Sequence, residues 1–239
     1  MRIAEKIARR AKDNWNEPGV TIAFLGDSVT QGCFGSTLTG DHSPFFDKDN
    51  AYHADLAHIF AVLYPGVPVN IINAGVSGGN APHGLARLER DVLSHNPDLT
   101  VVCFGLNDSG GGEEKLPVYL EALEGIFTKL KEADCEIIFM TPNMMCTDVS
   151  PLLLDEHLKK VAEGCAKREL DGGMALYLDA AKELCAKHGV TVCDCYARWR
   201  RLHETGANIT ELLSNKINHP TREMNWLFAI SLAETMLGM

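Results

Sequence analysis

Five short apolar runs alternate with helical patterns along the whole chain, and this alternation constrains the fold more than any other feature. The runs are rich in β-branched and aromatic residues, which predicts strands over 20–25, 67–72, 98–104, 135–141 and 190–194. Helical periodicity predicts helices over 2–16, 51–64, 80–95, 115–133, 152–187 (broken near Gly172-Gly173), 196–206 and 221–237. Near-continuous apolar strands suit a parallel sheet that is covered on both faces. We therefore predict a three-layer α/β sandwich, built by residues 1–239 as a single domain.

Composition narrows the class of protein. The 239 residues are 46% hydrophobic, which is normal for a chain with a sizeable core. The net charge of −10 argues against a nucleic-acid partner or an anionic membrane surface, because both attract an excess of Lys and Arg. The first residues mix charges and no apolar run is long enough to span a membrane, so we expect a cytoplasmic protein without a signal peptide. The sequence leaves the oligomeric state open.

The eight cysteines do not suggest a metal site. In a chain of this length without an export signal, they are expected to be reduced thiols. Cys193 and Cys195 lack the paired ligand clusters that zinc sites normally show. The glycine-containing turns match neither the dinucleotide-binding nor the phosphate-binding loop pattern. We therefore expect no metal and no cofactor.

The turn that follows the first strand carries the first candidate catalytic residue. Gly26-Asp27-Ser28 comes directly after the apolar run 20–25. Open α/β sheets place their ligand sites at the carboxyl ends of strands. Ser28 is therefore a candidate nucleophile.

Two further turns predict an oxyanion hole. Polar, glycine-containing turns follow the first three strands, over 26–32, 73–80 and 105–110. In a parallel sheet these turns lie at one edge, so Ser28, Gly78 and Asn107 are expected to converge. Acyl transfer needs a nucleophile and preorganised N–H donors, which the backbone of Ser28 and Gly78 and the amide of Asn107 can supply.

A histidine near the end of the sequence is the candidate base. His219 precedes Pro220 and the last helical pattern, so the proline fixes the loop that carries it. We expect His219 to take the proton of Ser28 and later to return it to the leaving group.

With these residues in place, the chain resembles the SGNH (GDSL-type) hydrolase superfamily. Gly26-Asp27-Ser28 looks like its first block, 73–78 like its second, 105–108 like its third and His219-Pro220 like its last. The segment 84–88 also fits the helix that follows the second block. The resemblance implies a flavodoxin-like sheet of about five parallel strands, and hydrolysis of esters or thioesters without a metal.

One position departs from the pattern of this superfamily, which usually has Asp three residues before the histidine. Lys216 stands there, and Asn215 precedes it. A lysine cannot orient the imidazole, and a nearby cation would disfavour the imidazolium. We hypothesise that Asn215 or a backbone carbonyl holds His219, with Asp194 as a weaker candidate.

Other polar residues flank the expected site. We assign Asp27, Asp108 and Asn143 to its possible pocket. Of these, we expect Asp27 to satisfy the amides of its turn and Asp108 to make structural hydrogen bonds, whereas loop capping explains Asn143 equally well. The long segment 32–50, which contains His42, is either a pocket wall or a surface insertion.

The sequence thus predicts a serine hydrolase that cleaves carboxylic esters of a small molecule or a glycan. Short acyl groups such as acetyl are the first expectation. Long-chain lysophospholipids or thioesters are the alternative substrates. A catalytically inactive carbohydrate-binding protein is the alternative class.

Overall fold

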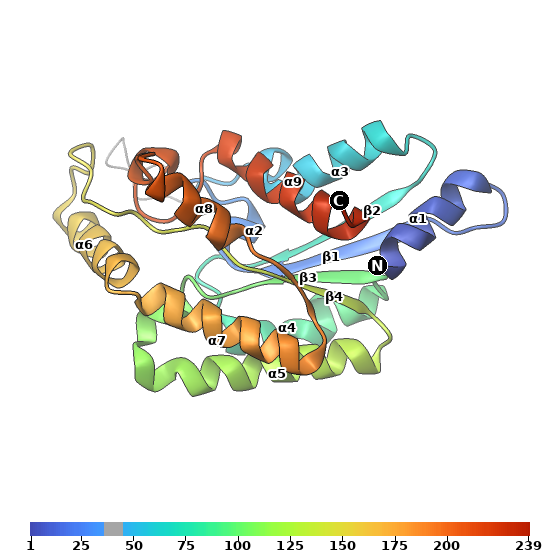
Figure 1. The fold of residues 1–239 in the computed structure, drawn as a ribbon, viewed down its shortest axis with the longest axis horizontal. Coiled ribbons are helices and arrows are strands. Elements are labelled where there is room, and N and C mark those ends of the chain that lie inside the picture. The colour runs from blue at the N-terminus through green and yellow to red at the C-terminus, as the bar shows by residue number, and fades with distance from the viewer. Residues whose placement is uncertain (36–44) are drawn as a thin grey trace.

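The computed structural model describes residues 1–35 and 45–239. Five strands form one parallel sheet in the order β2-β1-β3-β4-β5 (Figure 1). They are β1 (Val20–Gly26), β2 (Val69–Gly75), β3 (Leu99–Cys103), β4 (Glu136–Met140) and β5 (Thr191–Cys193). This is the strand order of flavodoxin-like sheets, so the predicted fold class is confirmed.

Helices cover both faces of the sheet (Figure 1). One face packs against α1 (Arg2–Lys12), α3 (Tyr52–Leu63), α8 (Cys195–Glu204) and α9 (Arg222–Leu237). The other face packs against α4 (Ala81–Asp91), α5 (Leu116–Glu132) and most of α7 (Gly173–His188). Two more helices, α2 (Ser28–Gln31) and α6 (Glu156–Leu170), follow the carboxyl ends of β1 and β4. No helix in the described part of the chain is long and apolar enough to cross a membrane.

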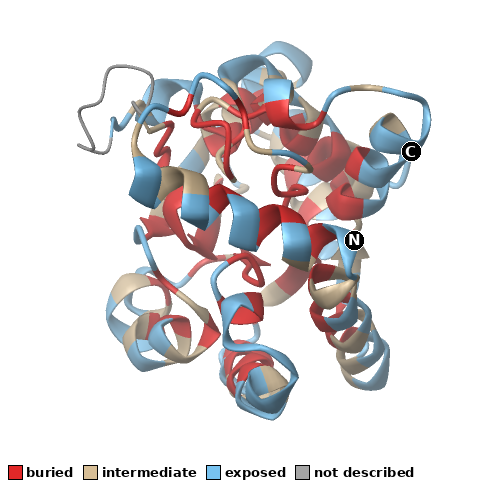
Figure 2. Ribbon diagram, turned by 90° about the vertical axis from the view of Figure 1, so that its left-hand side faces the viewer, coloured by how far each residue is buried: buried red, intermediate tan, exposed pale blue. Residues whose placement is uncertain are grey.

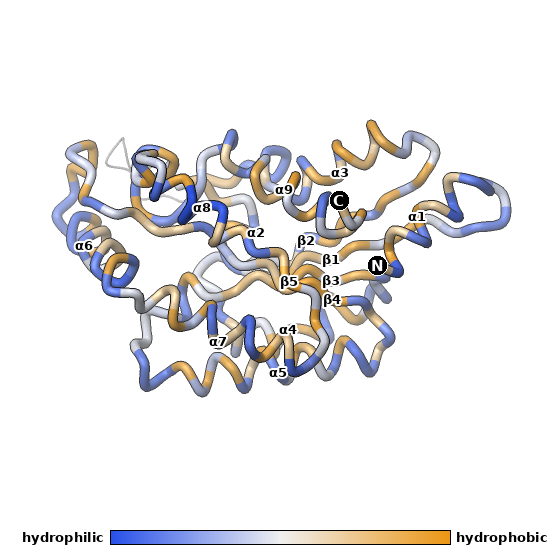
Figure 3. The backbone as a smooth tube through the Cα atoms, viewed as in Figure 1, coloured by the Kyte–Doolittle hydropathy of each residue, from blue (hydrophilic) through white to orange (hydrophobic). Residues whose placement is uncertain are grey.

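The alternation of side chains along β1 produces the two hydrophobic layers. Ile22 and Phe24 belong to the cluster under α3 and α9, whereas Ala23 and Leu25 belong to the cluster under α4 and α5. Successive side chains of a strand point to opposite faces, so a strand covered on both sides needs apolar residues throughout. Figures 2 and 3 show the result, with buried and hydrophobic residues concentrated on the strands and on the inward sides of the helices.

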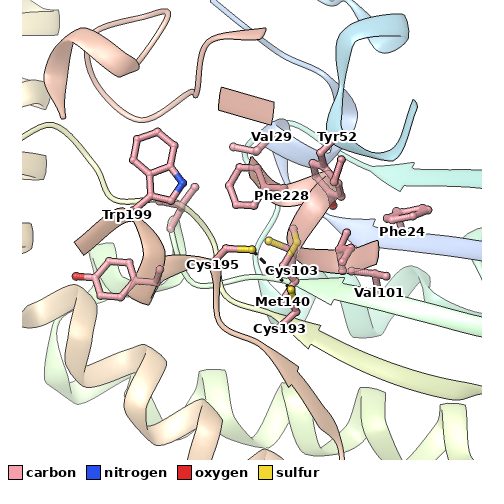
Figure 4. Close-up of a cluster of buried hydrophobic side chains, with 14 of the residues drawn as sticks. Phe24, Val29, Tyr52, Val101, Cys103, Met140, Cys193, Cys195, Trp199 and Phe228 are labelled. Carbon is pink, nitrogen blue, oxygen red and sulfur yellow. Dashed lines mark hydrogen bonds between the residues drawn. The ribbon is translucent and has the colours of Figure 1, made fainter. Parts of the chain in front are cut away.

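Aromatic rings fill the layer between β1, α3 and α9 (Figure 4). The ring of Tyr52 lies 5.7 Å from that of Phe24 and 5.6 Å from that of Phe228. Cys103, Cys193 and Cys195 pack beside them and are enclosed. All eight cysteines are buried and unpaired in disulfides. They therefore act as small apolar side chains here.

Two elements show where the predicted boundaries succeed and fail. The sequence predicts the second strand over 67–72, but it begins at Val69, because Pro68 has no N–H to donate to a neighbouring strand. The carbonyl of Pro68 still accepts from Val20 N at 3.0 Å. The long helical pattern breaks where expected, since Gly172 adopts a left-handed φ of +83° between α6 and α7.

Candidate active site

Ser28 is the first residue of α2, at the carboxyl end of β1. Asp27 caps this short helix, and its Oδ1 accepts a hydrogen bond from Val29 N at 2.9 Å. Ser28 and Asp27 are both buried. Gly26 is required between strand and helix, because a Cβ there would lie 2.0 Å from Thr30 Oγ1. The tight turn therefore holds the serine hydroxyl at the edge of the sheet.

His219 meets Ser28 from the other end of the chain. Its Nε2 lies 2.9 Å from Ser28 Oγ. The two ends of the loop that carries it are joined. Ser214 N donates to His219 O at 2.7 Å, and Leu213 and Pro220 form an isolated antiparallel β-bridge. The structure therefore brings together the predicted nucleophile and base within hydrogen-bond distance.

The three glycine-containing turns also meet, because their strands end at the same level. Gly26 is paired in register with Gly75 and with Cys103. Val76 N donates to Gly26 O at 3.1 Å, which joins the first turn to the second. Asn107 Nδ2 donates to Gly79 O at 2.7 Å, which joins the second to the third. The three turns form one connected rim.

Some N–H groups of this rim have no hydrogen-bond acceptor among the described residues. Among the described residues, neither Ser28 N nor Gly78 N has a hydrogen-bond acceptor. Asn107 uses one amide hydrogen on Gly79 O, and an amide carries a second. Gly78 has a φ of +73°, and a Cβ there would meet nothing within 4 Å, so its backbone conformation, and not a lack of space, calls for glycine. The rim therefore offers N–H donors to an anionic oxygen.

The imidazole of His219 has no acidic partner among the described residues. Its Nδ1 is buried and has no hydrogen-bond partner among the described residues. Burial lowers the pKa of His219 to about 4. Asp194, the weaker candidate, instead caps α8 through Ala197 N and accepts from Thr141 Oγ1 at 2.9 Å. The described residues therefore supply a pair and not a triad.

The expected contact between Asn215 and the imidazole is not found among the described hydrogen bonds. Asn215 Oδ1 instead accepts from the backbone N–H groups of Ile217, Asn218 and His219, at 3.0, 2.9 and 2.9 Å. A side-chain oxygen that follows its own chain in this way fixes a turn. Asn215 thus holds the backbone of the histidine loop, and the ring is held by Ser28.

Lys216 points away from the histidine. Its φ is +58°, and its Nζ lies 2.9 Å from Glu211 Oε2. The low pKa of His219 is caused by burial and not by this cation. The lysine at the family's usual acid position therefore belongs to an ion pair beside the site.

The three possible pocket residues have different places. Asn143 is fully buried, and its amide joins two segments of backbone, one of them the histidine loop. Asp27 lies under the first turn, where burial raises its pKa to about 7. Asp108 accepts from Ala81 N and Gly105 N, and burial raises its pKa to about 6. Asp108 also borders a hollow.

That hollow has a volume of about 250 Å³ and opens beside Asn107. Pro82, Val118 and Tyr119 contribute apolar walls, and Lys115 lies at the margin. No group of three metal-binding side chains occurs in the residues that the structure describes. His42 and the rest of residues 36–44, within the long segment 32–50, lie outside the described residues.

Arg87 supports the site, a role that the sequence does not predict. Its guanidinium donates to Gly26 O at 2.8 Å and to Ala74 O at 2.5 Å. These carbonyls lie at the ends of β1 and β2, so Arg87 ties together the strands that carry the first two turns. A cation on the helix after the second turn is visible in the sequence, but its partners are backbone atoms that no side-chain pattern reveals.

The fold and the site define a class, the α/β hydrolases of SGNH type, and a comparison with protein families agrees. The family model of the GDSL-like lipase/acylhydrolase family matches residues 24–227. The chain belongs to this family, so the resemblance predicted from the four blocks is confirmed.

Two characterised relatives are similar over part of their length. An acetylxylan esterase of Geobacillus stearothermophilus is 31% identical over 134 residues, which cover 52% of this chain and 60% of that protein. An arylesterase of Vibrio mimicus is 31% identical over 80 residues, which cover 34% of this chain and 40% of that protein. The aligned regions therefore span less than two thirds of either relative.

Solved structures share the fold over nearly the whole chain. The acetylxylan esterase from Geobacillus stearothermophilus superposes with a TM-score of 0.67 at 19% identity, covering 93% of this chain and 95% of that one. LAE5, an α/β hydrolase from the metagenome of Lake Arreo in Spain, gives 0.68 at 20% identity, covering 92% and 96%. In the esterase, catalytic variants have been made at an aspartate and at a histidine three residues later. Lys216 has that spacing from His219 here.

Proposed function

We propose that this protein hydrolyses carboxylic esters through an acyl-enzyme on Ser28. The observation that carries the proposal is the 2.9 Å contact between Ser28 Oγ and His219 Nε2, beside a rim with open N–H donors. A hydroxyl needs an adjacent base to become a nucleophile at neutral pH, and His219 is that base.

The first half-reaction forms the acyl-enzyme. Ser28 Oγ bonds to the acyl carbon while its proton moves to His219 Nε2. The carbonyl oxygen becomes negative and accepts hydrogen bonds from Ser28 N, Gly78 N and Asn107 Nδ2. The intermediate then collapses, the bond from the acyl carbon to the alcohol oxygen breaks, and that oxygen takes the proton from Nε2.

The second half-reaction releases the acid. A water molecule gives a proton to His219 Nε2 as its oxygen bonds to the acyl carbon. Collapse of the second intermediate breaks the bond to Ser28 Oγ, which recovers the proton. Throughout, Nδ1 keeps its own hydrogen, and no carboxylate of the described residues balances the transient imidazolium. We therefore expect slower turnover than a full triad would give.

We further propose that the acyl group is short, with acetyl on a carbohydrate as the first candidate. The names of the relatives, an acetylxylan esterase and an arylesterase, support esters of this general kind. Besides the ester and water, the proposed reaction uses only side chains and backbone groups of the protein.

The test is hydrolysis of p-nitrophenyl acetate, butyrate and octanoate and of acetylated xylo-oligosaccharide. Wild type is compared with Ser28→Ala and with the control Ser94→Ala, whose hydroxyl donates to Arg90 O on the surface. We expect activity on acetyl esters in wild type and Ser94→Ala, and loss of at least about 1,000-fold in Ser28→Ala. Preference for octanoate would favour the long-chain alternative. Equal rates in wild type and Ser28→Ala, or no turnover, would contradict the proposal and favour a binding protein.

A further inference from the structure

Asn143 is fully buried between the end of β4 and the loop that carries His219. Its Nδ2 donates to Asn218 O at 2.8 Å and to Met144 O at 2.8 Å. Both hydrogens of the amide are therefore used, one on its own segment and one on the histidine loop. The second bond joins residues that lie 75 positions apart in the sequence.

The segment around Asn143 is a firm support for that loop. Cys146 N donates to Ile217 O at 2.8 Å, which gives a second hydrogen bond between the two segments. Met145 N donates to the buried carboxylate of Glu169 at 2.9 Å, which fixes the segment to α6. The histidine loop is thus attached to a part of the core that is itself held in place.

One peptide unit of the histidine loop is held at both of its polar atoms. The carbonyl of Asn218 accepts from Asn143, and the N–H of His219 donates to Asn215 Oδ1 at 2.9 Å. These two atoms belong to the same planar peptide. Fixing both sets the rotation of that plane, and with it the direction in which the His219 side chain leaves the backbone.

The orientation of this peptide matters because few contacts restrain the imidazole ring of His219 itself. The described residues give the imidazole one hydrogen bond, to Ser28. We propose that Asn143 is a positioning residue for the base, and that with Asn215 it clamps the Asn218–His219 peptide in place of a carboxylate on Nδ1. The inference rests on the proposed function, since it assigns Asn143 to the same reaction.

The amide oxygen of Asn143 shows that the positioning role belongs to the amide hydrogens. Its Oδ1 is buried without a partner in the described part of the structure. A buried acceptor without a donor weakens the folded state. The amide therefore acts through its two donor hydrogens, which end on Met144 O and Asn218 O.

The experiment compares Asn143→Asp and Asn143→Ala with Thr141→Val. Asn143→Asp keeps the shape of the side chain but has at most one hydrogen to donate, and none when ionised, where the amide has two. Thr141 is the matched control, because it is equally buried and its hydroxyl bonds to Asp194 and to Tyr196 N, away from the histidine loop. The readouts are kcat, KM and the rate of Ser28 labelling by a fluorophosphonate, with thermal melts to keep every assay well below unfolding.

We expect both Asn143 variants to lose roughly 10- to 100-fold in kcat and in labelling rate, with KM within about threefold, because a misplaced base weakens the chemical step. Thr141→Val should lose stability without this loss of kcat. If folded Asn143→Ala and Thr141→Val have the same kcat as wild type within about twofold, the inference is wrong while the proposed function stands. If wild-type turnover does not depend on Ser28, both fail.

Discussion

At the scale of single residues, the environment of His219 sets the pH range over which the proposed base can accept a proton. The ring is taken out of water without an acid among the described residues to stabilise its cation, and this burial lowers its pKa to about 4. A base is useful only while it is unprotonated. The low pKa therefore keeps His219 ready to accept a proton well into the acid range.

The first prediction concerns pH. The value of kcat/KM should be nearly constant from about pH 8 to pH 5.5 and should fall as the pH drops through about 4, where His219 becomes protonated. The measurement is kcat/KM on an acetyl ester from about pH 3.5 to 8, with circular dichroism to verify folding. An acid limb near about pH 6.5 would mean that an unrecognised anion supports the imidazole.

Asp27 provides the control for this profile, because burial raises its pKa to about 7 and it adjoins the nucleophile. Asn at this position keeps an oxygen that can accept from Val29 N. The acid limb should persist in Asp27→Asn if His219 causes it. The same variant should gain stability relative to wild type as the pH rises from about 4 to about 7, because the unfolded chain gives up the Asp27 proton near about pH 4 whereas the folded protein keeps it until about pH 7; above this the difference should be constant.

The second prediction concerns the missing acid. Restoring an aspartate with Lys216→Asp should not create a triad, because the side chain at 216 is directed to Glu211. We expect kcat/KM within about threefold of wild type and a loss of about 1 kcal/mol in the free energy of unfolding, as the ion pair becomes a repulsion. Ester kinetics and urea unfolding check this. A tenfold gain in kcat/KM would show that the carboxylate reaches Nδ1.

Residues at strand ends are predictable from the sequence because periodicity and turn glycines place them. Ser28 lies at such an end, whereas His219 is predicted from Pro220 and the helical pattern that follows it, and the two side chains lie 2.9 Å apart. The supports of His219 are not predictable in this way. Asn215 and Asn143 act on backbone atoms, and which peptide they reach depends on how two distant loops pack.

At the scale of elements, the ends of β1 and β2 set the position of the first two turns. Arg87, on α4, donates to one carbonyl at each strand end. Its side chain is only 10% exposed and also pairs with Asp91 at 3.1 Å. Hydrogen bonds from a charged donor in such a place contribute more than surface contacts do.

The third prediction tests this link. Arg87→Ala should lower the free energy of unfolding by about 2–3 kcal/mol, because two buried carbonyls each lose a charged donor. Arg90→Ala is the matched control, since Arg90 pairs with the same Asp91 but is 76% exposed, and its loss should be far smaller. Urea unfolding of both variants decides. Equal losses would mean that Arg87 acts through Asp91 and not through the strand ends.

Element boundaries show where sequence patterns reach their limit. All five strands and the order of the main helices follow from apolar runs and periodicity. The start of β2 does not, because Val67 continues the apolar pattern although Pro68 cannot pair as a strand residue must. Backbone hydrogen bonding, which hydropathy does not report, fixes that boundary.

At the scale of the whole molecule, the two hydrophobic layers and the chain around them enclose every cysteine. Burial raises the pKa of Cys135 to about 11 and that of Cys146 and Cys185 to about 12. The thiolate is the reactive form of cysteine, so enclosed thiols of this kind react slowly. Thiol reactivity therefore reports on how tightly the core is closed.

The fourth prediction uses this property. An aromatic disulfide reagent should modify less than about one thiol per native molecule within minutes, and all eight once the chain is unfolded in urea. Absorbance of the released thiol gives the count. Rapid modification of several thiols in the native protein would show that the core opens far more readily than the packing indicates.

The most direct test of the central claim is covalent labelling of Ser28 with a fluorophosphonate, followed by mass spectrometry of the peptides. We predict a single label on Ser28 in wild type and labelling at least about 100-fold slower in His219→Ala, because the histidine activates the hydroxyl across the 2.9 Å contact. Absence of label on Ser28, or an equal rate in His219→Ala, would contradict the account.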